Sequence, residues 1–418
     1  MTEAKARPRV GLFHPGTQHV CATALALQRA DMLAWLATGL YYRPGSLQDR
    51  ALRLLPPRVC NAVLGQFRRR RCDDLDDSLI VTRSRWEWQV LLAQRLVPHS
   101  LWPDRLIRRR NRLFGRYVAS LAQRCPPSLL YGYDGASREA FEGVRERGIP
   151  CVLDQTIVAA SSRRRLAEEE RVRAPQVWCH DLDHTTPYDV ERERAEHALA
   201  HTVVCACEFS RASLVDQGVV PEDIVVVPYG VDSDLFRPAP RLSEPRFRLL
   251  FVGAIIPRKG VRYLLEAARR LHLPRGSVGL VGHLGVPREA LAPYEDLCVH
   301  VPHVPRNELP ALYRQGAVFA FPTLIEGFGL VLLEAAACGL PIIATTNCGA
   351  PELFGDVPCG ALVPPADLEA LTESLGDLLS KPEEAREMGR QARLRAEHFT
   401  WERYGQGLVA ALTNRFAG

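Results

Sequence analysis

Lysine is almost absent from this sequence. Only three of its 53 basic residues are lysines, namely Lys5, Lys259 and Lys381. The chain also lacks an apolar run long enough to span a membrane, and its first twenty residues lack the apolar stretch of a signal peptide. We therefore expect a protein that does not cross a membrane and that works in the cytoplasm.

Closely spaced cysteines are also missing, because the twelve cysteines are scattered and form no C-x-x-C pair. Structural zinc sites usually need such pairs, so we expect no bound metal. We expect the thiols to act as small buried residues in a reducing compartment. A G-x-G-x-x-G fingerprint does not follow the first apolar segment, which argues against a dinucleotide-dependent oxidoreductase.

The positive charge lies in the N-terminal half. Residues 1–240 contain 34 basic and 29 acidic residues, whereas the remainder contains 19 of each. Arginines cluster at 68–71, 105–112 and 163–165. Such runs form either a solvated face or a surface for an anionic partner. We expect no nucleic acid among the partners.

A chain of 418 residues is too long for one hydrophobic core and indicates at least two domains. The opening strand RPRVGLFHP is followed by the loop PGTQH and a helix-like run, TALALQRADMLAWLA. Short apolar runs then alternate with helix-compatible sequence up to a proline-rich linker at 232–245, after which the pattern restarts. This alternation predicts two doubly wound parallel sheets with a cleft between them.

The stretch AVFAFPTLIEGFGLVLLEAAACGLPIIAT places two acids, Glu326 and Glu334, in a segment that is otherwise almost free of charge. We expect a strand, a tight loop with Glu326, and a helix with Glu334 in its early turns. Gly327 and Gly329 let the backbone approach a ligand, and the helix N-terminus offers N–H groups to a phosphate. A ligand with both phosphates and hydroxyls, such as a nucleotide sugar, fits this arrangement.

Two carboxylates beside a diphosphate need cations nearby. Arg258 and Lys259 follow the first strand of the second unit, in FVGAIIPRKG, and are expected at the same edge of the sheet. Because the chain otherwise uses arginine, a lysine in this loop is less easily explained as a generic surface charge.

These motifs resemble those of a known family. EGFGLVLLE matches the E-x7-E motif of the retaining nucleotide-sugar glycosyltransferases called family four, or group 1. The segments VVVPYGVDSDLF, FVGAIIPRKGVRYLLEA and FTWERYGQGLVAAL are similar to that family as well. The resemblance implies the GT-B fold, with two facing Rossmann-like domains. It implies an N-terminal acceptor-side domain at 1–238, a nucleotide-sugar domain at 246–398 and a closing helix at 399–418 that returns to the first domain.

The resemblance also implies roles for single residues. Glu326 would lie beside the hydroxyls of the donor sugar, and Lys259, helped by Arg258, would neutralise the diphosphate. Glu334 would bind the ribose. The amides of Gly327, Phe328, Gly329 and Leu330 would face sugar and phosphate, and the loop with Gly16, Gln18 and His19 would lie near the phosphates and the acceptor.

The chain departs from the family pattern at Ala254, where arginine is common, and at Asp154, where histidine is common. The implied function is a retaining transfer of a hexose from a nucleoside-diphosphate sugar to an acceptor hydroxyl, in polysaccharide, lipid-linked glycan or glycoconjugate synthesis, without metal or other cofactor. Two alternatives stay open: an epimerase-like GT-B enzyme, and a non-catalytic sugar-nucleotide-binding partner.

The acceptor side carries a further pattern. Residues 59–71 combine an apolar face with a basic cluster, as interfacial membrane segments do. We expect weak peripheral contact with the inner membrane face and a glycan, lipid-linked or small-molecule acceptor. The alternative is a helix that packs on the first domain with its arginines in water.

Overall fold

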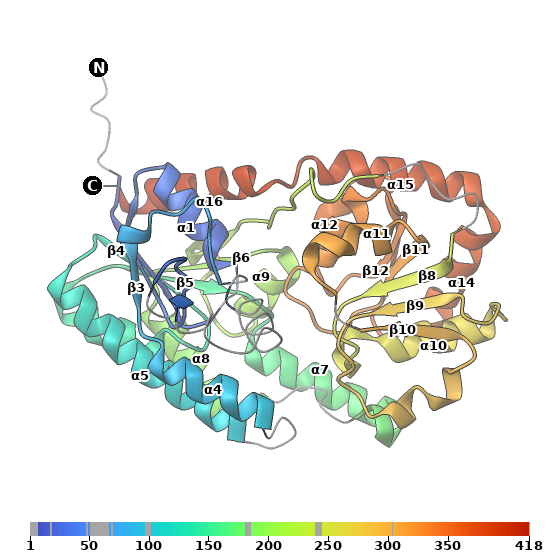
Figure 1. The fold of residues 1–418 in the computed structure, drawn as a ribbon, viewed down its shortest axis with the longest axis horizontal. Helices are drawn as coiled ribbons and strands as arrows, with labels where there is room; N and C mark the ends of the chain where they lie inside the picture. Colours follow the sequence, from blue (N-terminus) through green and yellow to red (C-terminus); the bar gives the residue numbers. More distant parts are fainter. Residues whose placement is uncertain are drawn as a thin grey trace.

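The computed structural model describes residues 7–16, 19–46, 49–50, 67, 70–96, 102–179, 185–238, 245–302 and 304–417. They form two α/β domains that lie side by side (Figure 1). Each is built on one parallel sheet, because strand–helix alternation returns every strand in the same direction.

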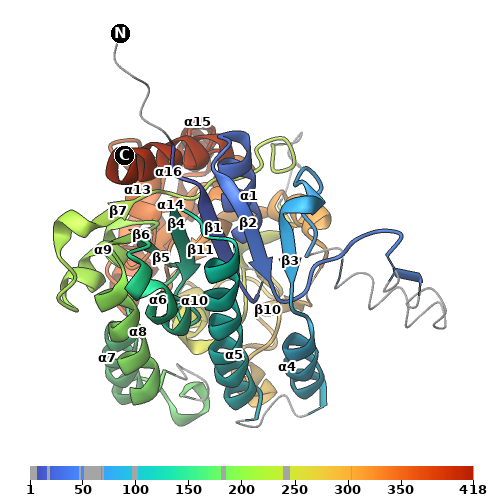
Figure 2. The same cartoon turned by 90° about the vertical axis from the view of Figure 1, so that its left-hand side faces the viewer.

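The first domain contains a seven-stranded parallel sheet with the spatial order β3-β2-β1-β4-β5-β6-β7. Its strands are β1 (Val10–His14), β2 (Leu33–Thr38), β3 (Ile80–Thr82), β4 (Leu129–Tyr133), β5 (Cys151–Gln155), β6 (Thr202–Cys205) and β7 (Ile224–Val226). Figure 2, which turns this domain toward the viewer, shows the strands between two layers of helices.

The helices of the first domain are α1 (Val20–Arg29), α4 (Arg85–Leu96), α5 (Trp102–Arg124), α6 (Arg138–Val144), α7 (Ala160–Arg173), α8 (Pro187–Leu199) and α9 (Glu208–Val215). The strands are buried on both faces, and their apolar side chains belong to two hydrophobic clusters on opposite faces of the sheet. Such strands read as continuous apolar runs.

The helix-like run TALALQRADMLAWLA is wrong as a single helix. Helix α1 ends at Arg29, Asp31 takes a positive φ of 56°, and Leu33–Thr38 forms β2. A strand buried on both faces has no two-residue alternation, so periodicity could not separate it from the preceding helix.

The second domain contains a six-stranded parallel sheet with the order β10-β9-β8-β11-β12-β13. Its strands are β8 (Phe247–Val252), β9 (Val278–Val281), β10 (Cys298–Val301), β11 (Gly316–Phe321), β12 (Ile342–Thr345) and β13 (Gly360–Val363). Its helices are α10 (Val261–Arg270), α11 (Leu309–Tyr313), α12 (Leu330–Ala337), α13 (Ala350–Phe354), α14 (Leu368–Ser380) and α15 (Pro382–Ala396). The predicted fold class of two facing doubly wound domains is confirmed.

Two segments connect the domains and run side by side, since Val231 forms a parallel bridge with Thr400. The second segment leads into α16 (Trp401–Phe416), which lies over the first domain (Figure 1). There the Tyr404 hydroxyl lies 2.8 Å from that of Thr23 on α1. The chain thus leaves the second domain and closes on the first.

One expectation about cysteine is wrong, because Cys21 and Cys72 form a disulfide between α1 and the segment before β3. Their separation of 51 residues hides this pairing from any spacing argument. The other cysteines of the described chain are free, and most are buried as expected. No helix in the described ranges is long and apolar enough to cross a membrane.

Candidate active site

A cavity of about 1130 Å³ lies between the two domains. The first domain contributes His19, Thr156 and one face of α1, and the segment between β7 and the linker contributes Tyr229 and Val231. The second domain contributes Lys259, Arg306, Glu326 and the start of α12. The carboxyl ends of both sheets meet here, as expected for open parallel sheets.

Lys259 and Glu326 converge because their two loops are bonded together. The backbone N–H of Leu324 donates to the carbonyl of Arg258 over 2.8 Å, and the Arg258 guanidinium donates to the carbonyl of Ile325 over 2.9 Å. Since β8 and β11 are neighbours in the sheet, the loops that follow them start side by side. The Lys259 ammonium then pairs directly with the Glu326 carboxylate.

This cluster consists of charged side chains that are largely buried. The side chains of Lys259 and Glu326 are 12% and 14% exposed, and the Arg258 guanidinium lies 3.4 Å from the same carboxylate. Burial, and then the charge of Arg258, lower the pKa of Lys259 well below its usual range. The Glu326 carboxylate favours the charged amine and opposes both effects.

The N-terminus of α12 opens on the cavity through Gly329 and Leu330. Gly329 has a φ of 90°, which only glycine adopts without strain. Gly327 has a different reason to be glycine, because a Cβ there would meet the Thr156 carbonyl oxygen at 2.2 Å. Its own carbonyl accepts a hydrogen bond from Cys207 of the first domain over 2.6 Å. Gly327 therefore lies at the contact between the domains.

Glu334 lies on α12 and is buried. Its carboxylate accepts a 2.9 Å hydrogen bond from the Tyr313 hydroxyl and lies 3.8 Å from the Arg306 guanidinium, which lines the cavity. Burial raises the pKa of Glu334, while Arg306 and Tyr313 favour the carboxylate. Glu334 itself is not among the residues that line the cavity, and Arg306, which links it to the cavity, had no signal in the sequence.

On the first domain, His19 lies in the cavity wall and its Nε2 is 2.9 Å from an oxygen of Asp154. The Tyr131 hydroxyl donates to the same oxygen over 2.7 Å. Asp154, at the position where the family often has histidine, thus turns inward and orients His19. The Gly16 amide donates to Nδ1 of His14 over 3.0 Å, and Gln18 lies outside the described residues.

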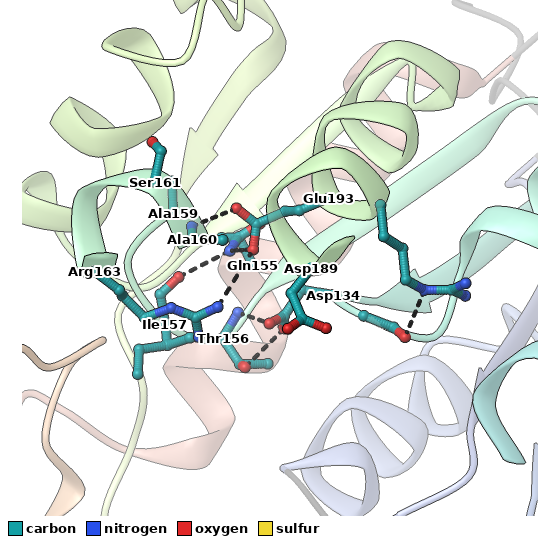
Figure 3. A network of polar contacts seen from close by, with 12 residues as sticks. Asp134, Gln155, Thr156, Ile157, Ala159, Ala160, Ser161, Arg163, Asp189 and Glu193 are labelled. Carbon is teal, nitrogen blue, oxygen red and sulfur yellow. Dashed lines mark hydrogen bonds and ion pairs between the residues drawn. The ribbon is translucent and has the colours of Figure 1, made fainter. Parts of the chain in front are cut away.

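Thr156 follows β5 and reaches the cavity from a network of buried polar groups (Figure 3). Asp134, just after β4, accepts from both the N–H and the hydroxyl of Thr156, over 3.0 and 2.7 Å. Glu193 of α8 accepts from the Ala160 amide over 2.6 Å, and Arg163 lies 3.9 Å from it. These contacts fix the end of β5, although Thr156 and Asp134 were not predicted as site residues.

Tyr229 was also missed, although it lies in the motif VVVPYGVDSDLF. Tyr229 lines the cavity, and its hydroxyl is buried and has no hydrogen-bond partner in the described chain. Its ring packs 4.4 Å from that of His19 and 5.7 Å from that of Phe328. Burial raises the pKa of Tyr229 well above its usual range, so the hydroxyl stays protonated. The Phe328 side chain thus lines the cavity next to Tyr229.

Solved structures of low sequence identity share this architecture. Sucrose-phosphate synthase from Thermosynechococcus elongatus has a TM-score of 0.65 at 19% identity and covers 98% of this chain and 100% of its own. HepE from Anabaena in complex with UDP has a TM-score of 0.63 at 14% identity and covers 97% and 100%. At these identities the likeness shows the fold, which is GT-B.

Residues 232–395 match the family model of "Glycosyl transferases group 1". The second domain matches the group 1 glycosyl transferases. Two curated relatives match about half of the chain. MMP alpha-(1->4)-mannosyltransferase of Mycolicibacterium hassiacum is 39% identical over 217 residues, which are 49% of this chain and 51% of that protein.

The second relative is the GDP-mannose-dependent alpha-(1-6)-phosphatidylinositol monomannoside mannosyltransferase of Mycolicibacterium smegmatis. It is 34% identical over 215 residues, which are 45% of this chain and 56% of that protein. The chain thus spans about half the length of the curated relatives that it matches.

Proposed function

We propose that this group 1-type chain is a glycosyltransferase that moves a hexose from a nucleoside-diphosphate sugar to an acceptor hydroxyl, with retention at the anomeric carbon. The observation that carries the proposal is the buried cluster of Lys259, Arg258 and Glu326 beside the N-terminus of α12, in a cavity shared by both domains. Two cations next to a helix N-terminus support this proposal, because both would stabilise a departing diphosphate.

In the proposed reaction, the chain's own groups stabilise charge. Lys259 and Arg258 bind the departing diphosphate as it gains negative charge, together with the amides at Gly329 and Leu330. Glu326 lies beside the sugar hydroxyls and Glu334 holds the ribose. The departing phosphate takes the proton of the acceptor hydroxyl on the same face, so no separate nucleophile or acid pair is required.

The reaction needs no bound metal in this proposal, because Lys259 and Arg258 supply the positive charge. In the described residues no group of three or more His, Cys, Asp or Glu side chains could hold a metal ion. Turnover that persists in excess EDTA is expected, and loss of turnover that a divalent cation restores would contradict this part.

The donor is tested first with GDP-mannose, which the name of the Mycolicibacterium smegmatis relative specifies, and then with UDP-, ADP- and TDP-sugars. Thermal-shift measurements identify the nucleotide that stabilises the protein, since a ligand that binds the folded state raises its melting temperature. Transfer to glycan, lipid-linked and small-molecule acceptors follows.

Three outcomes separate the candidate functions. A transferred hexose with the donor's anomeric configuration in its proton NMR spectrum supports the proposal, and the opposite configuration overturns retention. A changed sugar without any acceptor indicates the epimerase-like enzyme. Binding without turnover across the acceptor panel indicates the non-catalytic partner.

A further inference from the structure

The outer face of α5 carries a row of four exposed arginines, Arg105, Arg109, Arg112 and Arg116, here called the arginine stripe. None of the four has an ion pair or hydrogen bond with another described residue. Their spacing of four, three and four residues places them on one side of the helix, along about 16 Å of its axis. Helix α5 contains seven arginines and a single acid, Asp104, which lines a small cavity on another side of the helix.

On two other exposed helices of the chain, arginines of this kind are paired with acids. On α7, Arg164 and Arg165 each face a glutamate four residues later. On α15, Arg386 and Arg390 each face a glutamate three residues earlier. The preference for arginine over lysine therefore does not by itself explain the stripe, because on α7 and α15 the same preference comes with neutralising acids.

Large apolar side chains are exposed next to the stripe. Trp102 begins α5 one turn before Arg105, on the same side of the helix, and is 63% exposed. On α4, Trp88 and Leu92 lie four residues apart and are 41% and 58% exposed.

The exposed faces of α4 and α5 point the same way. Trp86 of α4 packs against the same hydrophobic cluster as Phe114 and Val118 of α5, so both helices cover one face of the first sheet. The two helices lie side by side in both views (Figures 1 and 2). Their outer sides therefore form one surface, with apolar groups and the arginine stripe together.

We propose that this outer face of α4 and α5 binds the surface of an anionic lipid bilayer. Arginines in a row attract anionic headgroups, and indole rings are favoured at the boundary between headgroups and acyl chains. A nucleic acid or a polyanionic glycan would use the arginines but would leave Trp88, Leu92 and Trp102 in water. The surface is distinct from the segment 59–71, most of which lies outside the described residues. The proposal does not depend on the transferase activity.

Sedimentation of the full-length protein with vesicles tests the proposal. Vesicles of phosphatidylcholine mixed with phosphatidylglycerol bind the protein at about 50 mM NaCl and release most of it at about 500 mM, because the Debye length shortens. Vesicles of phosphatidylcholine alone bind little. The variant R105Q/R109Q/R112Q/R116Q lowers partitioning onto the anionic vesicles by at least about 100-fold.

The matched control is R164Q/R165Q/R386Q/R390Q, which removes the same net charge from arginines that are already paired. It lowers partitioning by less than about tenfold. An equal loss in both variants would assign binding to overall charge and overturn the proposal. All substituted positions are on the helix surface, so the melting temperatures should match that of the wild type.

The apolar part is tested by Trp102→Ala, which weakens vesicle binding at least about threefold but leaves retention on a heparin column unchanged. Retention on heparin together with failure to bind anionic vesicles would identify a soluble polyanion as the partner and overturn the membrane assignment. Donor-induced thermal shifts, measured on the same variants, show separately whether the nucleotide-sugar site is intact.

Discussion

Lys259 and Lys381 allow a matched comparison of two lysines in a chain that uses arginine almost everywhere. Lys259 is in the cavity and pairs with Glu326, whereas Lys381 is 56% exposed and lies 3.7 Å from Glu384. We expect Lys259→Ala to lower kcat by about 100- to 1000-fold with a much smaller change in donor KM, because its charge matters most as the diphosphate departs. Lys381→Ala should leave both constants unchanged, and a kcat for Lys259→Ala within about threefold of wild type would remove Lys259 from the mechanism.

The two acids of the E-x7-E motif should differ in their kinetics. Glu334→Gln should raise donor KM by about tenfold or more with little change in kcat, because a ribose contact acts equally in the ground and transition states. Glu326→Gln should mainly lower kcat, since it removes the carboxylate that favours the charged form of Lys259 in a buried site. Steady-state kinetics with the identified donor distinguish them, and identical profiles would contradict the separate roles.

The sequence singled out most of these residues but not their partners. Glu326 and Glu334 were predicted because two acids stood in an almost uncharged segment, and Lys259 because lysine is rare in this chain, whereas His19 followed only from the family resemblance. The partners Tyr313, Arg306 and Asp154 come from other elements and lie 21 to 135 residues away from Glu334 or His19, which they contact or approach. In a chain with 53 basic residues, composition cannot decide which cation meets which acid.

At the scale of elements, Gly260 joins the short turn at Pro257–Lys259 to α10. Its φ is 68°, and a Cβ would lie 1.8 Å from the carbonyl oxygen of Pro322. Gly148 has a similar φ of 64° but no atom within 4 Å of the same position. Gly148→Ala should cost about 1 kcal/mol of unfolding free energy from backbone strain alone. Gly260→Ala should lower the unfolding free energy, measured by urea denaturation, several times more than Gly148→Ala. Equal losses would show that the backbone at Pro322 moves aside without cost.

His14, at the end of β1, should make the fold sensitive to acid. Burial, and then the charge of Arg110, lower the pKa of His14 to about 3, and its Nδ1 accepts from the Gly16 amide. Between pH about 6.5 and about 3, His14 binds a proton in the unfolded chain but not in the folded chain. The free energy of unfolding therefore falls as the pH falls through this range.

The corresponding variant is His14→Asn, whose amide oxygen can still accept from Gly16 but does not titrate. Its melting temperature should fall less than that of the wild type between pH about 7 and about 5. The exposed His398 provides the control, because His398→Asn should follow the wild-type curve. Parallel curves for His14→Asn and wild type would contradict the assignment.

Element type was predictable where local sequence decides it. Helix α12 was expected because glycines precede a helix-forming run and Gly339-Leu340-Pro341 ends it. The boundary between α1 and β2 was not, because Asp31 in a positive-φ turn gives no strong signal between two apolar segments. The arginine stripe was visible as a charge run, but its exposure and lack of partners needed the packing of α5.

At the scale of the whole molecule, a further contact crosses between the domains, away from Gly327 and from α16. Glu170 on α7 of the first domain accepts hydrogen bonds from Arg262 and Tyr263 on α10 of the second domain, over 2.9 and 2.6 Å. Glu170 is buried, and the Arg262 side chain is only 14% exposed. No sequence motif predicts this contact, because each partner looks like an ordinary helix-surface residue in the sequence.

This contact should hold the cleft closed on the side opposite the linker. Glu170→Ala should destabilise the closed arrangement by about 3 kcal/mol, because it leaves a buried guanidinium without its carboxylate. The free variant should then show a larger radius of gyration in small-angle X-ray scattering, and a bound donor that touches both domains should shorten it again. Glu168→Ala on the same helix removes an exposed acid whose one ion pair among the described residues is with Arg164, and this variant should scatter like the wild type. Superimposable curves for Glu170→Ala and wild type would show that the connecting segments and the contact at Gly327 set the distance between the domains without Glu170.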